Sequence, residues 1–160
     1  MDYVWTPWRY RYLSSSPKNN ECFLCSAAAA ADDAESLVVL RAEKNFVILN
    51  RYPYTSGHAM IVPYAHQNSF SALDPTTVAE MMALAQRVQV ALEKTYRPDG
   101  YNLGMNLGRA AGAGVENHLH FHALARWFGD TNFMTTVGET RLEPEELAVT
   151  YQKLRAALAS

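Results

Sequence analysis

The chain has 160 residues, enough for one domain with its own hydrophobic core, and 49% of them are hydrophobic while 19% are charged. The formal net charge of −2 argues against a surface that binds polyanions such as nucleic acid. No apolar run approaches the length that spans a membrane, and the first residues lack the apolar core of an export signal, so we expect a cytoplasmic protein.

Two segments precede the first predicted strand. Residues 1–20 join an aromatic, basic stretch to a turn-forming one, which predicts an irregular arm. Residues 21–36 hold both cysteines of the chain, Cys22 and Cys25, and an alanine-rich stretch that is either a short helix or a linker. In a chain without an export signal, this Cys-x-x-Cys spacing favours half of a metal site or a redox pair over a structural disulfide, and two buried thiols are a further alternative.

The next part of the chain predicts three strands and a long helix. Residues 37–42 and 46–50 are rich in β-branched side chains and flank a short polar turn, as in a hairpin, and residues 58–64 form a third apolar run. Residues 74–96 begin with an Asp-Pro pair suited to a helix N-terminus and then repeat apolar side chains at steps of three and four. The repeat consists of Val78, Met81, Ala85, Val88 and Leu92.

The last part of the chain predicts two more strands and a second helix. Residues 101–107 and 118–125 have strand character, and the glycine-rich residues 108–114 form a loop between them. A final helix is expected to begin around Pro144, followed by acidic residues suited to its positive end. Hairpin strands with two separated helices predict an α+β fold with an antiparallel sheet, in a single domain of residues 1–160.

Three of the five histidines alternate within one predicted strand, at His118, His120 and His122. Successive side chains of a strand point to opposite faces, so these imidazoles share one face while Leu119 and Phe121 take the other. An exposed polar face, a catalytic metal site, and nucleophilic attack on phosphorus by a neutral imidazole are all compatible with the pattern.

This pattern and its surroundings resemble the histidine triad (HIT) superfamily of nucleotide hydrolases and transferases. HLHFHAL fits that family's alternation of histidine and apolar residues, GHAMIVPYAH (57–66) resembles its glycine–histidine strand, and MNLG (105–108) resembles its phosphate loop. The flanks WTPWRYRYL and RWFGDTNFMTTVGETR are similar to a bacterial branch that includes diadenosine polyphosphate phosphorylases. The likeness implies a HIT-like sheet of about five antiparallel strands, one long and one C-terminal helix, and a homodimer with a continuous sheet.

The resemblance also implies roles for individual residues. His120 would be the nucleophile that takes the nucleotide, and His122 and His58 would lie against the transferred phosphate. Arg109 and Arg126 are candidates for added positive charge. The residues implied in nucleotide and phosphate binding are Asn50, Asn106, Gly108, Arg109, Gly112 and Gly114. Glycines in such a loop let backbone N–H groups approach an anion without a high net charge.

The cysteine pair acquires partners through the same resemblance. Zinc-containing members complete a site with the histidine after the Ile-Val-Pro strand and with the first histidine of the triad, here His66 and His118. The implied ligands are therefore Cys22, Cys25, His66 and His118. Four protein ligands indicate structural Zn²⁺, whereas three protein ligands and a water would indicate a catalytic ion.

The implied function is nucleotidyl transfer from a dinucleoside polyphosphate such as Ap4A, or a related nucleotide, through a nucleotidyl-histidine that phosphate or water resolves. The alternatives are a hydrolase of phosphoramidates or adenylated substrates, a hydrolase with catalytic zinc, and a nucleotide-binding protein without turnover. The chain departs from common members just before the triad, where Gly114 and Val115 replace a hydroxyl or amide that reaches the leaving group. Asn117 is the candidate substitute.

Overall fold

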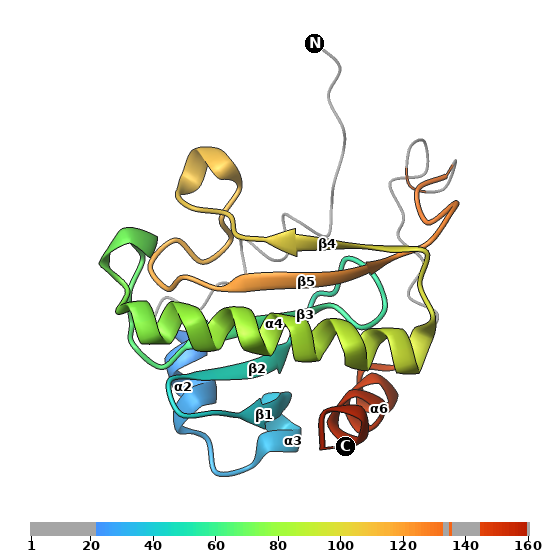
Figure 1. The fold of residues 1–160 in the computed structure, drawn as a ribbon, viewed down its shortest axis with the longest axis horizontal. Coiled ribbons are helices and arrows are strands. Elements are labelled where there is room, and N and C mark those ends of the chain that lie inside the picture. Colours follow the sequence, from blue (N-terminus) through green and yellow to red (C-terminus); the bar gives the residue numbers. More distant parts are fainter. Residues whose placement is uncertain (1–21, 133–134, 136–144, 160) are drawn as a thin grey trace.

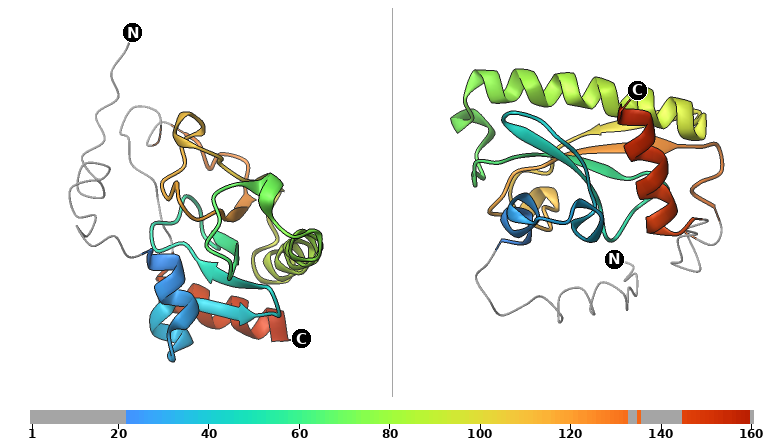
Figure 2. Two further views of the ribbon diagram at one scale, coloured as in Figure 1. Left: turned by 90° about the vertical axis from the view of Figure 1, so that its left-hand side faces the viewer. Right: turned by 90° about the horizontal axis from the view of Figure 1, so that it is seen from below.

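The computed structural model describes residues 22–132, 135 and 145–159. The predicted arm of residues 1–20 and the expected helix start at Pro144 lie outside these residues. Figures 1 and 2 show a single antiparallel sheet with helices on both faces. Its five strands are arranged in the order β1-β2-β3-β5-β4. They are β1 (Val38–Arg41), β2 (Asn45–Leu49), β3 (Ala59–Pro63), β4 (Gly100–Gly104) and β5 (Phe121–Arg126).

The helices confirm the α+β prediction with one long and one C-terminal helix. They are α2 (Phe23–Ala29), α3 (Asp33–Ser36), α4 (Pro75–Tyr96) and α6 (Leu147–Ala159), with short 3₁₀ turns η1 (Phe70–Ala72) and η2 (Arg109–Ala111). The alanine-rich segment is therefore helical rather than a linker. None of the described helices combines the length and the apolar character that crossing a bilayer requires.

Helix α4 begins and ends where the sequence predicts. The Asp74 side chain accepts a hydrogen bond from the backbone N–H of Thr77 at 3.2 Å, and Pro75 occupies the first turn, where a missing N–H leaves no bond unmade. The helix ends at Tyr96, and the C-cap residue Arg97 adopts the left-handed conformation. One face of α4 is buried against the sheet at Thr77, Met81, Leu84, Ala85, Val88, Ala91 and Leu92.

Two hydrophobic clusters lie on opposite faces of the sheet, because successive strand side chains alternate in direction. Val47 and Leu49 of β2 belong to the cluster that α4 and α6 cover. Phe46 and Ile48 belong to the cluster that α2 covers with Leu24. The two faces are visible in Figure 2, where α2 and α4 lie on opposite sides of the strands.

The strand that carries the histidines is shorter than predicted. Strand β5 begins at Phe121, so His118 and His120 lie in an irregular segment before it, and the prediction of a strand from residue 118 is wrong. Ile61 pairs with Phe121, which places Pro63 opposite residue 119. Proline has no N–H to donate, so the ladder stops there, and the Leu119 N–H instead donates to the Gln67 carbonyl at 2.8 Å. Strand β4 likewise ends at Gly104 rather than at residue 107.

Candidate functional site

The alternating histidines lie on the α2 face of the sheet. Leu119 packs in the cluster under α4. The His118 ring instead faces Cys22 at the start of α2, and the His120 ring lies against His122. His122 pairs across the sheet with Met60, which belongs to the cluster under α2. All three imidazoles are buried. The predicted common face is thus retained although only His122 belongs to a regular strand.

His58 reaches the same face from the turn before β3. Gly57 makes this turn possible because its φ is +79°, and a Cβ there would lie 2.7 Å from Leu92 Cδ2. The Tyr54 backbone N–H donates to His58 Nδ1 at 3.1 Å, so this nitrogen is an acceptor and the proton of the neutral ring is on Nε2. His58 Nε2–H then donates to His122 Nδ1 at 2.9 Å. By the same reasoning, the neutral His122 ring carries its proton on Nε2.

His120 has the opposite tautomer. Its Nδ1–H donates to the His118 backbone carbonyl at 2.9 Å, because a carbonyl can only accept. This hydrogen bond leaves the lone pair of His120 on Nε2. The ring centroid of His122 is 4.7 Å away. The site therefore presents a ring nitrogen with a free lone pair beside a ring whose Nε2 carries a proton.

Burial keeps these rings neutral. It lowers the pKa of His120 below its ordinary value, and burial together with the neighbouring His120 lowers the pKa of His122 to about 4. Burial is also the main cause that lowers the pKa of His118. A neutral imidazole is the form that can attack phosphorus or bind a metal.

Two residues, Tyr54 and Asn50, contact His58, and the sequence did not predict these contacts. The Tyr54 ring lies against His58 with centroids 4.6 Å apart, and it is 6.1 Å from the His122 ring. Asn50, which the resemblance implied in nucleotide binding, lies with Nδ2 3.3 Å from His58 Nδ1. Its Oδ1 also accepts the Tyr52 backbone N–H at 2.9 Å, so Asn50 holds the turn that leads to His58.

The predicted phosphate loop leaves the sheet next to the histidines. Gly104 at the end of β4 is paired with His122, so Asn106 follows within two residues of that point. Gly108 and Gly112 both have φ near +80°, a conformation that L side chains rarely adopt (+79° and +83°). Figure 1 shows this loop, with η2, beyond the end of β4.

Neither candidate arginine is directed at the histidines. Arg109 has an 89% exposed side chain and pairs with Glu116 at 3.4 Å. Arg126 is the last residue of β5, away from His120, and its Nε pairs with Asp130 at 2.6 Å. Within the described part of the chain, the loop beside the imidazoles therefore offers glycine-rich backbone, and neither of these two arginines adds positive charge there.

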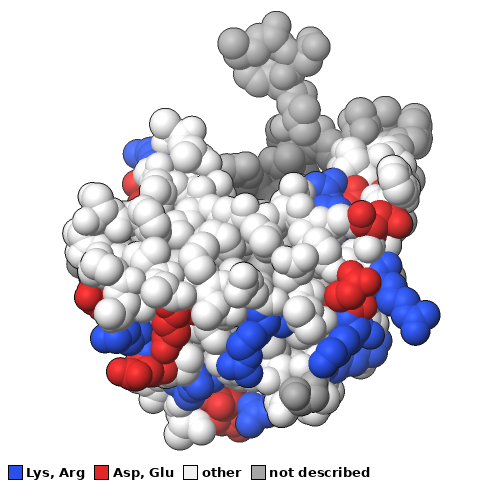
Figure 3. Space-filling view, viewed as in Figure 1, with Lys and Arg blue, Asp and Glu red and all other residues white. Residues whose placement is uncertain are grey.

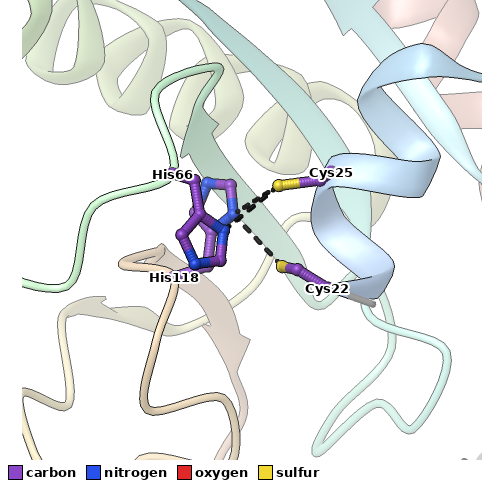
Figure 4. A group of neighbouring side chains, drawn as sticks. All are labelled: Cys22, Cys25, His66 and His118. Carbon is purple, nitrogen blue, oxygen red and sulfur yellow. Dashed lines mark hydrogen bonds between the residues drawn. The ribbon is translucent and has the colours of Figure 1, made fainter. Parts of the chain in front are cut away.

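The cysteines and two histidines form one compact group (Figure 4). His118 Nδ1 lies 3.3 Å from Cys22 Sγ and 3.5 Å from Cys25 Sγ, and His66 Nδ1 lies 3.2 Å from Cys25 Sγ. All four ligand atoms lie within 4.8 Å of one another. A tetrahedral ion with ordinary Zn–S and Zn–N bonds separates a sulfur from a nitrogen by about 3.6 Å, so the donor set fits zinc.

The His118 ring is also in the tautomer that a metal needs. Its Nε2–H donates to the Pro63 carbonyl at 2.9 Å, which leaves the lone pair on Nδ1, the nitrogen that faces the two sulfurs. Among the described residues this is the one cluster of three or more metal-type side chains, and it includes neither His120 nor His122. This geometry disfavours a catalytic metal held by the whole triad.

An antiparallel sheet with an alternating row of histidines at the start of β5 is the arrangement of a histidine triad protein. A model of the HIT domain matches residues 31–129, and the chain belongs to the HIT family.

The relatives match this chain over most of its length. The chain is 36% identical over 158 residues to the AP-4-A phosphorylase of Mycobacterium tuberculosis, a match that covers 94% of this chain and 81% of the relative. A Zn-bound histidine triad family protein from Mycobacterium smegmatis has a TM-score of 0.70 at 31% identity, covering 87% of this chain and 94% of the other. A hypothetical histidine triad nucleotide-binding protein from Sulfolobus tokodaii has a TM-score of 0.69 at 26% identity, covering 86% and 92%.

Proposed function

We propose that the protein transfers a nucleotidyl group from a dinucleoside polyphosphate through a covalent intermediate on His120. The observation that carries this proposal is the hydrogen bond from His120 Nδ1–H to the His118 carbonyl, which leaves Nε2 as a free nucleophile. The likeness to an AP-4-A phosphorylase over nearly the whole chain supports this substrate class.

In the first step the His120 Nε2 lone pair forms a bond to the α-phosphorus, and the bond from that phosphorus to the bridging oxygen breaks. The electron pair leaves with a nucleoside polyphosphate, whose oxygens already carry negative charge, so a strong general acid is not required. The ring becomes a cation, which the His118 carbonyl stabilises through Nδ1–H. His122 Nε2–H is suited to donate to an oxygen of the transferred phosphate.

In the second step phosphate or water attacks the phosphorus and the nitrogen–phosphorus bond breaks, which restores neutral His120. The backbone N–H groups of the loop that holds Gly108 and Gly112 are suited to bind the equatorial oxygens in both steps. The Tyr54 backbone N–H donates to His58, and His58 donates to His122 Nδ1. These two hydrogen bonds keep His122 in the tautomer that can donate through Nε2.

The acceptor is tested by incubating Ap4A with the protein, with and without inorganic phosphate, and identifying the products. Phosphorolysis yields ADP and ATP and requires phosphate, whereas hydrolysis yields AMP and ATP in either case. We expect ADP and ATP, because the Mycobacterium tuberculosis relative, whose match covers 94% of this chain, is named a phosphorylase. Formation of AMP at the same rate with or without phosphate would show a hydrolase, and no product from Ap4A would refute this substrate class.

We also propose that Zn²⁺ is bound by Cys22, Cys25, His66 and His118 and is structural. Four protein ligands leave no open position for a substrate. When bound, the ion cross-links α2, the segment after β3 and the segment before β5. His118 belongs to both the metal site and the histidine site. Its ring faces the thiols, and its backbone carbonyl accepts a hydrogen bond from His120 Nδ1–H. A fixed His118 therefore fixes the tautomer and position of the nucleophile.

We further propose a homodimer with a continuous sheet. Strand β4 is last in the strand order, so one of its edges is unpaired within the described part of the chain. Exposed apolar side chains lie on β4 at Leu103 and on α4 at Met82 and Val90. Figure 3 shows few charged side chains over β4 and the upper side of α4. Sedimentation equilibrium should give twice the 17.9 kDa chain mass, and a monomer at micromolar concentration would exclude this interface.

A further inference from the structure

The helix that carries both cysteines is too short to be stable by itself. Helix α2 has seven residues, and its N-cap, Cys22, makes no side-chain capping hydrogen bond. Leu24 and Ala27 are buried against the sheet, which fixes one face of the helix. The position of the two sulfurs therefore depends on what else holds α2.

Arg41, the last residue of β1, holds the opposite end of this helix. Its Nη1 donates to the Ala28 carbonyl at 2.6 Å, and its Nη2 donates to the carbonyls of Ala27 and Ala30 at 3.1 Å each. These carbonyls belong to the last turn and C-cap of α2, where intrahelical donors run out and the helix dipole is negative. One guanidinium thus satisfies three acceptors.

A carboxylate, in addition to these three carbonyls, fixes the orientation of the guanidinium. Arg41 Nε donates to Asp33 Oδ1 at 2.8 Å, and Asp33 lies in α3, directly after the chain leaves α2. Burial alone would lower the pKa of Arg41, but hydrogen bonds with Asp33 and Tyr64 raise it. The hydrogen bonds of Arg41 to the α2 carbonyls therefore join β1 to the helix that supplies two of the four metal-type ligands.

We propose that Arg41 is a positioning residue of the metal site, which holds α2 so that Cys22 and Cys25 face His66 and His118. This inference rests on the proposed zinc site. A lysine cannot replace Arg41, because its ammonium is a single point of charge, whereas the planar guanidinium reaches three carbonyls and a carboxylate at once. Without Arg41 the last turn of α2 frays, and part of the metal-binding free energy is then used to order the helix.

The test measures zinc affinity of full-length Arg41→Met and Arg41→Lys by competition with a chromophoric chelator. Outer groups of this kind typically contribute about 10–100-fold to metal affinity, so Arg41→Met should bind zinc about 10–100-fold more weakly and Arg41→Lys should fall in between. In the Co²⁺-substituted protein, the visible bands of the tetrahedral ion should shift or weaken in Arg41→Met.

Arg87→Met is the matched control. Arg87 Nη2 donates to the Leu158 carbonyl at 2.9 Å, near the C-terminus of α6, a helix that supplies no metal ligand. Both methionine variants should lower the melting temperature, but only Arg41→Met should lower zinc affinity and alter the cobalt spectrum. If Arg41→Met does not fold, the zinc affinity of Arg41→Lys is compared with that of Arg87→Met instead.

Two results would overturn the inference alone: unchanged zinc affinity in both Arg41 variants, or an equal loss of affinity in Arg87→Met. A wild-type protein that binds no zinc would instead refute the metal site itself, and the inference with it.

Discussion

Replacing His120 with alanine should lower turnover of Ap4A by about 10⁴-fold or more, since the substitution removes the proposed nucleophile. His120 Nε2 is the one nitrogen of the row whose lone pair the hydrogen-bond pattern leaves free for phosphorus. Nucleotide binding should change little, because the phosphate oxygens are expected to contact the loop backbone and His122. Steady-state kinetics and calorimetric titration with a non-hydrolysable nucleotide measure the two quantities.

Phe121→Leu is the control for this variant. Phe121 is the next residue along the chain but packs in the cluster under α4, so its substitution perturbs the same strand without reaching the phosphate. Turnover in Phe121→Leu should remain within about tenfold of wild type. Turnover of His120→Ala near the wild-type rate would refute the assignment of the nucleophile.

Replacing Cys22 with serine should remove most of the zinc and lower the melting temperature. Structural zinc sites contribute roughly 10–16 kcal/mol, so loss of one of four ligands costs about 3 kcal/mol, or about a hundredfold in affinity. In a chain of this size, that corresponds to a decrease of about 6–12 °C in melting temperature. Metal analysis of the purified protein and calorimetric melting test both effects.

Ser26→Ala is the matched control, because Ser26 lies on the same helix, is exposed and is not among the metal-type ligands. Its zinc content should equal that of wild type. If Cys22→Ser retains a full equivalent of zinc, or if metal-free wild-type protein melts at the same temperature as the loaded protein, the structural role of the metal is refuted. Turnover should also fall in Cys22→Ser, since His118 positions His120.

Much of the fold could be predicted from periodicity alone. Helix α4 was predicted to its ends, because Asp74 and Pro75 mark its start and the apolar steps of three and four continue to Leu92. The start of β5 could not be predicted from its own residues. It is set by Pro63, a residue of β3 whose backbone cannot donate a hydrogen bond. The local sequence of β5 does not indicate which residue of a distant strand will lie opposite it.

The sequence predicted the group of cysteines and histidines but not the protonation pattern of the histidine rings. The grouping of the two cysteines with His66 and His118 came from the family resemblance, and the structure brings these four side chains together. The tautomers follow from Tyr54 N–H and from the carbonyls of His118 and Pro63. Every residue except proline offers the same backbone donor and acceptor, so only the fold reveals which of them reaches a ring.

The contacts of Arg41 also could not be predicted from the sequence. A charged residue at the end of a strand is usually solvated, and nothing in the surrounding sequence distinguishes it. Its partners are carbonyls of α2, 11 to 14 residues earlier in the chain. Contacts of this kind depend on how a helix is placed on a sheet, which local propensities do not determine.

The covalent step is tested most directly by mass spectrometry of the protein quenched during turnover of Ap4A. Quenching in base preserves a phosphoramidate, and trypsin releases residues 110–126, between Arg109 and Arg126, with all three histidines of the row. We expect one adenylyl group on this peptide, assigned to His120 by fragmentation and absent in His120→Ala. An adenylyl group on another residue, or active turnover with no adduct on any peptide, would contradict the account.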